Sequence, residues 1–341
     1  MGEADALSFD FYGLRVAVQA EDGDLLEDVR RDFSYFRAAP GVAAMRVALR
    51  AEPGPRAELP RLKAALQTPR NIVYRDADVS YIDYFGKALM TQGRRDGACV
   101  IYCRDRDLAH EIAFLTILSR VGEHLDAIGL HRVHALGLQA QGSAALVLLP
   151  MGGGKTTLTL QMLQTEGIRL LSEDSPLISR SGEVHPFPLR LGVQPGEEPP
   201  GTPAEQTRTV QRMEHGPKTL IDIELYRDRI GERCPPGVIL LGERWLAGRS
   251  VILPERRRRA LDAFLRHCVV GLGLYQGVEF VFERTAWEII GKAGVALSRL
   301  RNSLSVIRRA RVYRFAMGPD RRQSAQVLAE FLHSKALRRD D

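Results

Sequence analysis

The chain of 341 residues lacks long apolar runs, internal repeats and low-complexity segments, and these absences exclude several classes of protein. No apolar stretch approaches the ~20 residues that a transmembrane helix needs, so we expect no membrane partner. The opening residues, MGEADALSFDF, show no basic region followed by an apolar one, and therefore no secretory signal. We expect a cytoplasmic protein.

Cysteine is scarce, and its four positions form no CxxC pair. Cys99 and Cys103 flank three residues of an expected strand, where their spacing does not favour joint binding of a metal. Cys234 and Cys268 stand alone. We expect all four to be reduced thiols.

Positive charge is in moderate excess, with a formal net charge of +6. The densest basic run is ERRRRA, residues 255–260, which is a candidate for contact with nucleic acid. No aromatic residues alternate with these arginines, and no nucleic-acid motif accompanies them. The run therefore predicts a solvated helix start after Pro254, and we expect no nucleic-acid partner.

The length and the patterning predict two domains. Residues 1–105 read as a small α+β N-terminal module that presents or recognises a substrate, and residues 106–341 read as a catalytic domain. In the first part we expect strands over 12–20, 42–51, 71–85 and 98–105, a helix over 24–36 and a proline-rich link over 52–60. A long helical pattern over 108–130 opens the second part.

The second part continues with an order of elements that is typical of a P-loop core. Two apolar strands, over 131–140 and 144–150, meet at Gly142-Ser143. A glycine run, a helix over 156–167 and a strand over 168–178 that contains acidic residues follow. We expect SGEVHPFP to close a hairpin and PPGVILLGERW to form a further core strand.

The stretch LLPMGGGKTTL, residues 148–158, predicts a phosphate-binding loop. Gly152, Gly153 and Gly154 permit positive φ angles and have no Cβ to hold a phosphate away. Because no proline lies within residues 152–157, we expect every N–H of this cradle to be available, together with the positive end of the helix that follows.

Three residues at the end of this loop complete the expected nucleotide site. Lys155 is expected to reach the β- and γ-phosphates of ATP, Thr156 to ligate Mg²⁺, and Thr157 to contribute its N–H group. The usual signature also has a glycine where this chain has Leu149. The loop tolerates Leu149 if Pro150 makes the turn out of the strand.

Two acids and one histidine are, together with Lys155, the candidate catalytic groups. Glu173 and Asp174 end the next strand, and the carboxyl ends of parallel strands share one edge, so we expect both beside the loop. One can hold Mg²⁺ while the other accepts a proton from an attacking hydroxyl. His134 has the same strand parity as Leu136 and Leu138, and packing in the core is the alternative to a catalytic position.

Residues 134–188 resemble the catalytic core of HPr kinase and its relatives, which share a P-loop fold with phosphoenolpyruvate carboxykinase. The matching features are His134-Ala135, a hairpin, the glycine loop, a helix that ends near Gly167, and LLSED followed by GEVHPFP. HPr kinases carry Asp-Asp where this chain has Glu173-Asp174. The rest of the chain fits that architecture only in outline, without the C-terminal segment that grips a protein substrate.

The resemblance implies an α/β fold with a P-loop kinase core of the HPr kinase/phosphoenolpyruvate carboxykinase type after a smaller α+β module. It implies that Lys155 and the loop bind ATP and that Glu173 activates the substrate hydroxyl. It also implies that Asp174 lies near Mg²⁺ and His134 near the transferred phosphate. Which acid is the base and which binds the metal stays open, as does assembly into a homo-oligomer.

Three functions follow from these features. The first is a kinase that moves the γ-phosphate of ATP to a hydroxyl of a protein or peptide serine, or of a small molecule. The second is a nucleotide-gated ATPase or binding module, and the third is a carboxykinase-type enzyme. The acid pair favours the first. Arg190 and Lys218 lie beside proline-rich bends and are candidates for holding phosphate, although solvated surface charge is the simpler interpretation.

Overall fold

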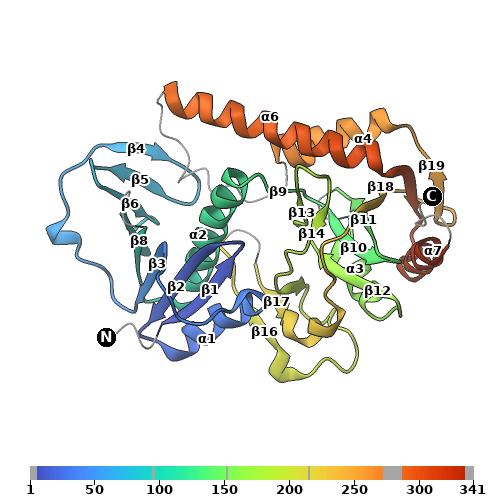
Figure 1. The fold of residues 1–341 in the computed structure, drawn as a ribbon. Helices are drawn as coiled ribbons and strands as arrows, with labels where there is room; N and C mark the ends of the chain where they lie inside the picture. Colours follow the sequence, from blue (N-terminus) through green and yellow to red (C-terminus); the bar gives the residue numbers. More distant parts are fainter. Residues whose placement is uncertain (1–5, 94–96, 151–152, 214–215, 272–285, 335–341) are drawn as a thin grey trace.

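The α/β class that the sequence predicts is confirmed by a computed structural model, which describes residues 6–93, 97–150, 153–213, 216–271 and 286–334. Several sheets and helices form two halves that meet along the middle of the molecule (Figure 1). No helix in the described part is both long enough and apolar enough to cross a membrane.

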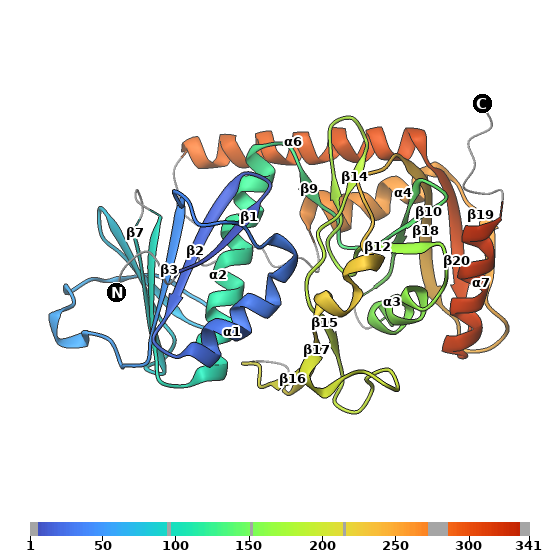
Figure 2. The same ribbon diagram turned by 60° about the horizontal axis from the view of Figure 1, so that its bottom comes forward.

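An eight-stranded sheet forms the N-terminal half, with strand order β1-β2-β3-β8-β7-β6-β5-β4. The strands are β1 (Leu7–Phe11), β2 (Leu14–Ala20), β3 (Met45–Arg50), β4 (Ala64–Gln67), β5 (Ile72–Arg75), β6 (Val79–Asp83), β7 (Ala88–Gly93) and β8 (Ala98–Cys103). Helices α1 (Gly23–Asp32) and α2 (Arg106–Ala127) pack on one face of this sheet (Figure 2).

The sheet is larger than the sequence predicts. The expected strand over 71–85 is a hairpin, because residues 76–78 turn the chain between β5 and β6. Strands β1, β4 and β7 are not among the expected elements. The expected helix over 24–36 ends at Asp32 and is followed by a separate 3₁₀ turn, Ser34–Phe36.

Helix α2 belongs by its packing to the N-terminal half. Asp105 caps it, since its side chain accepts the Leu108 N–H at 3.1 Å. The buried face of α2, which includes Ile112, Ile117 and Val121, lies in the same core cluster as the strands of the eight-stranded sheet. The predicted division at residue 105 thus separates α2 from the sheet on which it rests.

A six-stranded sheet forms the centre of the second half, with strand order β12-β10-β11-β18-β20-β19. Its strands are β10 (Leu136–Ala140), β11 (Ser143–Leu148), β12 (Ile168–Ser172), β18 (Pro236–Arg244), β19 (Val251–Pro254) and β20 (Arg311–Met317). Strand β11 is parallel to β18, and β18 to β20, while β10 is antiparallel to both β11 and β12. The carboxyl ends of β11, β12, β18 and β20 therefore lie at one edge.

Both faces of this sheet are covered. Helices α3 (Lys155–Leu163) and α7 (Arg321–His333) pack on the face that includes Val147. Helices α4 (Arg257–Phe264) and α6 (Ala286–Arg309) cover the face that includes Leu146, and a π-helical turn, Leu265–Val270, extends α4. This alternation along β11 is the pattern of a strand buried on both sides.

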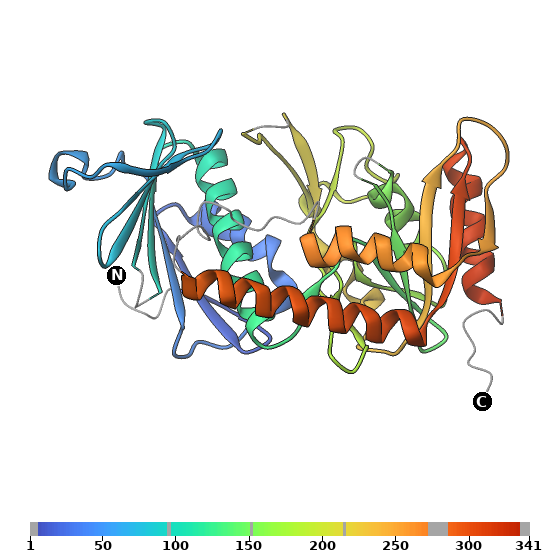
Figure 3. The ribbon, with the colours of Figure 1, turned by 90° about the horizontal axis from the view of Figure 1, so that it is seen from above.

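Helix α6 runs along both halves of the molecule (Figures 1 and 3). Arg299 of α6 forms an ion pair of 2.6 Å with Asp126 of α2. Asn302 donates to the carbonyl oxygen of Gly129 at 2.9 Å. These contacts link the helix that covers the second sheet to the helix that covers the first.

Two three-stranded sheets complete the second half. One contains β9 (His131–Arg132), β13 (Leu177–Ile178) and β14 (Val184–His185), and the other contains β15 (Leu191–Val193), β16 (Thr207–Val210) and β17 (Lys218–Ile221). The hairpin expected around residues 181–188 is confirmed by the pairing of β13 with β14. The single strand expected over 131–140 is wrong, because β9 and β10 belong to different sheets.

Two smaller predictions are also settled. The four cysteines are buried and form no disulfide. Residues 256–259 are exposed around the start of α4, as expected for a solvated helix start after Pro254.

Candidate active site

A cleft of about 920 Å³ lies between α2 of the N-terminal half and the carboxyl edge of the six-stranded sheet. Its walls include the start of α3, the residues that follow β12, and parts of β15, β16 and β17. The cleft is rich in cations: eight arginine and lysine residues line it, against five aspartate and glutamate residues. This balance favours an anionic ligand.

The glycine loop leads directly from β11 into α3. Gly154 has φ +87°, a left-handed conformation that a side chain would strain, and it serves as the N-cap of α3. No side chain caps this end, so the first N–H groups of α3, including those of Thr156 and Thr157, face the cleft side without a capping oxygen. Such an end binds anions. Gly152 lies outside the described residues.

The turn before Gly154 uses one of the expected donors. The Gly153 N–H donates to the carbonyl oxygen of Pro150 at 2.9 Å, so the expectation that every N–H of the cradle is available is wrong for Gly153. Leu149 is fully buried, and its side chain fills the space beside Gly242 of β18, where an added Cβ would lie 2.1 Å from Leu149 Cδ2. Leu149 thus anchors the loop in the core while Pro150 closes the turn.

Arg244 is a site residue that the sequence analysis did not assign. It ends β18, and its Nε donates to the carbonyl oxygen of Gly153 at 3.3 Å. Its guanidinium occupies the space beside Gly154, where an added Cβ would lie 2.5 Å from Nη2. The sequence signal that could have identified Arg244 is its place at the end of a core strand. The carboxyl end of such a strand, when parallel to its neighbours, reaches the same edge as the loop.

Lys155, His134 and Asp174 form one cluster. The Lys155 ammonium lies 2.8 Å from His134 Nε2 and 3.3 Å from Asp174 Oδ1. Because an ammonium group only donates, His134 Nε2 is the acceptor in the contact with Lys155. His134 Nδ1 lies 3.2 Å from Asp174 Oδ1, an ion-pair distance whose angles fall outside hydrogen-bond geometry.

His134 lies in the bend between β9 and β10, and not within a strand as expected. Its neighbours on either side bond to the chain after β12: Val133 N–H to Pro176 O at 3.0 Å, and Ala135 N–H to Asp174 O at 3.3 Å. The imidazole is only 4 % exposed, yet it faces Lys155. The ring is therefore both buried and in contact with the loop lysine.

Glu173 is the other acid of the pair. Its carboxylate accepts a hydrogen bond from the Thr156 hydroxyl. Burial and the negative charge of Asp174 raise the pKa of the Glu173 carboxyl. Burial acts in the same direction on Asp174, but His134 and Lys155 outweigh it and bring the pKa of Asp174 below its usual value. Two neighbouring carboxyl groups whose pKa values are pushed apart are typical of an acid–base site.

A buried serine holds the turn that carries these acids. Ser172, the last residue of β12, donates its hydroxyl proton to the carbonyl oxygen of Phe187 at 2.8 Å. Its Oγ also accepts the Ser175 N–H at 3.1 Å. The turn that presents Glu173 and Asp174 is thereby fixed at both ends.

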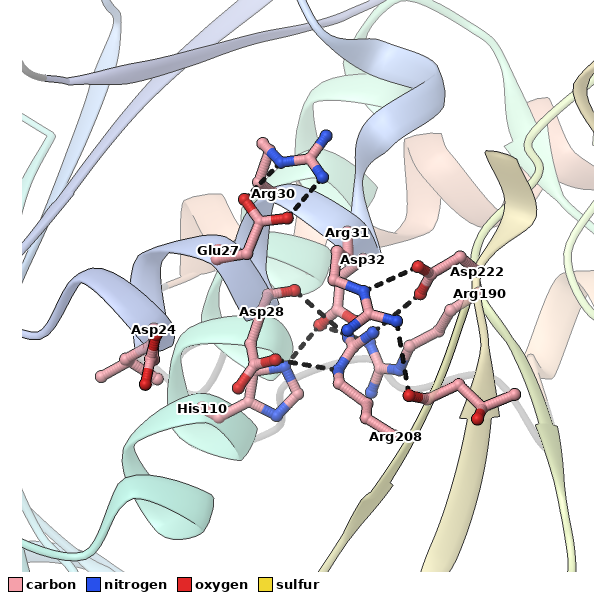
Figure 4. Close-up of polar contacts among 12 residues, drawn as sticks. Asp24, Glu27, Asp28, Arg30, Arg31, Asp32, His110, Arg190, Arg208 and Asp222 are labelled. Atoms are coloured by element: carbon pink, nitrogen blue, oxygen red, sulfur yellow. Dashed lines mark hydrogen bonds and ion pairs between the residues drawn. The ribbon is translucent and has the colours of Figure 1, made fainter. Parts of the chain in front are cut away.

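Arg190 is not a solvated surface residue. It forms an ion pair of 2.8 Å with Asp32, which is fully buried, and its guanidinium lies 3.4 Å from the ring centre of Phe114. Figure 4 shows the network in which this pair lies: Asp32 also contacts His110 at 2.7 Å and Arg208. The network joins α1 and α2 to the sheet of β15, β16 and β17, on the wall of the cleft.

Lys218, the other candidate cation, lines the cleft from the start of β17. Its side chain lies against Gly192 of β15, where an added Cβ would meet Cε at 2.2 Å and Nζ at 2.5 Å. Burial lowers the pKa of the Lys218 ammonium, although the charge of Glu173 opposes this. The position of Lys218 in the sequence does not predict that it lies near a catalytic group.

The donor set fits Mg²⁺ held together with a nucleotide. No cluster of three or more His, Cys, Asp and Glu side chains arranged for a metal exists within the described parts of the chain. Mg²⁺ in nucleotide sites does not need one, since it uses one or two carboxylates, phosphate oxygens and water. Thr156 and the two acids supply such ligands beside the uncapped end of α3.

No family model matches this chain, and a search of curated proteins finds no significant similarity.

Proposed function

We propose that the protein is an ATP-dependent kinase that transfers a γ-phosphate to a hydroxyl group, in the cytoplasm, with a serine of a protein or peptide as the favoured acceptor. The observation that supports this most is the junction of an uncapped α3 start with Lys155 and two carboxyl groups of divergent pKa. A small-molecule hydroxyl is the alternative acceptor.

Each side chain has a role in this proposal. The N–H groups at the start of α3 and the Lys155 ammonium bind the phosphates, and Arg244 braces the loop from β18. Lys155 leaves Asp174 for the phosphate, which makes that carboxylate available to Mg²⁺ together with Thr156. ATP supplies the phosphoryl group, and Mg²⁺ balances its charge.

Glu173 takes the proton in the transfer step. The acceptor oxygen forms a bond to the γ-phosphorus while the bond from that phosphorus to the β–γ bridging oxygen breaks, and ADP leaves with the electron pair. The hydroxyl proton passes to Glu173. The raised pKa of Glu173 suits this role, because a stronger base shares the proton more fully.

We expect Mg-ATP to stabilise the protein and Lys155→Ala to abolish that effect. Nucleotide at ~100 times its dissociation constant should add about 2.7 kcal/mol to the free energy of unfolding. A thermal-shift titration measures it, with the exposed Lys87→Ala as the matched control. If wild-type protein shows no shift and Lys155→Ala does not differ from it, the nucleotide site is absent.

We expect His134→Ala to reduce turnover while the affinity for ATP stays within a few-fold. The imidazole holds the Lys155 ammonium at 2.8 Å, so its loss leaves the lysine less well oriented toward the transferred phosphate. Turnover and KM for ATP are measured together, and His134→Gln should restore part of the turnover because its amide oxygen can accept from Lys155. Wild-type turnover in the alanine variant, or its unfolding, would favour a purely structural His134.

A further inference from the structure

Lys218 is a cation of the cleft wall that no described acid neutralises by a close contact. It belongs to the sheet of β15, β16 and β17, whereas Lys155 is the first residue of α3, so the two ammonium groups come from different elements. Lys155 is in contact with Asp174 and His134. Glu173, which would take the acceptor's proton, is the acid whose charge acts most strongly on Lys218.

Among the residues that the structure describes, Lys218 has positive neighbours and no acid within ion-pair distance. Its side chain makes no hydrogen bond or close ion pair with any other residue in the described ranges. The nearby guanidinium groups of Arg212 and Arg190 disfavour its charge further. Asp32 pairs with Arg190 but also with Arg208 and His110, so it offsets the charge of Arg190 only in part. A half-buried ammonium in this setting gains strongly from an anion brought beside it.

The position of Lys218 depends on a glycine. Gly192 of β15 pairs with Leu220 of β17, and the stem of Lys218 runs over its Cα. Any side chain at position 192 would displace the end of the lysine, which is flexible and can move without unfolding the strand. This arrangement holds the lysine on the wall of the cleft, where the charge of Glu173 acts on it.

We infer that Lys218 forms a second anion site, separate from the phosphate loop, and that the acceptor carries a phosphate or carboxylate group close to its reacting hydroxyl. This inference rests on the proposed function. An acceptor whose hydroxyl lies at Glu173 would place its neighbouring substituents against Lys218. Leu220, Val210 and Phe114 line the same cleft and would pack against the apolar part of the acceptor.

Inorganic phosphate is the first probe of this site. Its binding is measured calorimetrically in the presence of Mg²⁺ and a non-hydrolysable ATP analogue, so that the γ-position is already filled. We expect phosphate to bind wild-type protein, and Lys218→Met to weaken it by about tenfold or more, as the loss of a charge-assisted contact does. Gly192→Ala should weaken it similarly, and the exposed Lys63→Met should not.

Two results would overturn the inference. One is equal phosphate affinity in wild type and Lys218→Met. The other is phosphate that binds wild-type protein only when the analogue is absent, because Lys218 would then serve the γ-phosphate. The affinity for the ATP analogue is measured in the same variants. If phosphate binds but the nucleotide does not, the proposed function fails and the anion site stands. If the nucleotide binds but phosphate does not, only the anion site is removed.

Competition identifies the source of the anion. A serine peptide with a neighbouring glutamate is compared with the same peptide carrying glutamine, and glycerol 3-phosphate with glycerol. Displacement of phosphate by the acidic peptide but not its neutral partner indicates a peptide acceptor, and displacement by glycerol 3-phosphate alone indicates a small phosphorylated acceptor. Displacement by neither contradicts an anionic acceptor.

Discussion

Glu173→Gln should reduce phosphotransfer by about 10²–10⁴-fold, the usual contribution of a positioned general base. Glutamine keeps the shape and can still accept the Thr156 hydroxyl through its amide oxygen, so Mg-ATP should bind within a few-fold of wild type. The measurement is transfer from labelled ATP to candidate acceptors that are encoded beside this protein.

The pH profile distinguishes a base from a residue that only shapes the site. Burial and Asp174 raise the pKa of Glu173, and a base acts only when deprotonated, so wild-type turnover should fall as the pH drops through that raised pKa. Glu173→Gln should remove this acidic limb. Asp174→Asn is the matched control, and we expect it to weaken the binding of Mg²⁺. If no acceptor is ever labelled while a partner modulates ATP hydrolysis, the protein is a nucleotide-gated ATPase.

Asp32→Asn should lower the free energy of unfolding by about 3–5 kcal/mol, the usual cost of removing one member of a buried ion-pair network. The carboxylate contacts Arg190, Arg208 and His110, and an asparagine would turn an N–H donor toward one of these donors (Figure 4). Urea unfolding measures the change. A loss no greater than that of Asp24→Asn, an exposed acid of the same helix, would contradict the prediction.

The same carboxylate predicts how stability depends on pH. Burial opposes ionisation of Asp32, but Arg190, His110 and Arg208 lower its pKa from 3.8 to about 2. A pKa lowered by folding stabilises the protein above the unfolded value, here by roughly 2 kcal/mol at neutral pH, and this is lost as the pH falls from about 4 to about 2. Asp32→Asn should lack this component of acid unfolding, and Asp24→Asn should retain it.

The network places the N-terminal half beside the candidate active site. It attaches α1 and α2 to the sheet that carries Lys218, so the wall of the cleft depends on residues from both halves. We therefore expect Asp32→Asn protein that remains folded at low temperature to show weaker phosphate binding as well. This result would connect the N-terminal half of the chain, for which the sequence predicts substrate recognition, to the wall of the cleft that carries Lys218.

The glycine loop and the acid pair could be predicted from the sequence alone. Those features are local: three glycines, Lys155 and Thr156 are adjacent in the chain, between the apolar run of β11 and the helical pattern of α3, and the acid pair directly follows β12. The strand–loop–helix–strand order follows from hydrophobic periodicity alone. The carboxyl-edge rule then predicts Glu173 and Asp174 beside the loop, where they are found.

Only the tertiary structure decided which residues complete the cleft. His134 reaches Lys155 because the chain bends between two sheets, and Arg244 contacts Gly153 from a position 91 residues further along the chain. Arg190 is buried against Asp32, which lies in the other half of the molecule. Lys218 is held on the wall of the cleft against Gly192 of a neighbouring strand. Such contacts depend on strand pairing and packing between distant segments, which local periodicity does not encode.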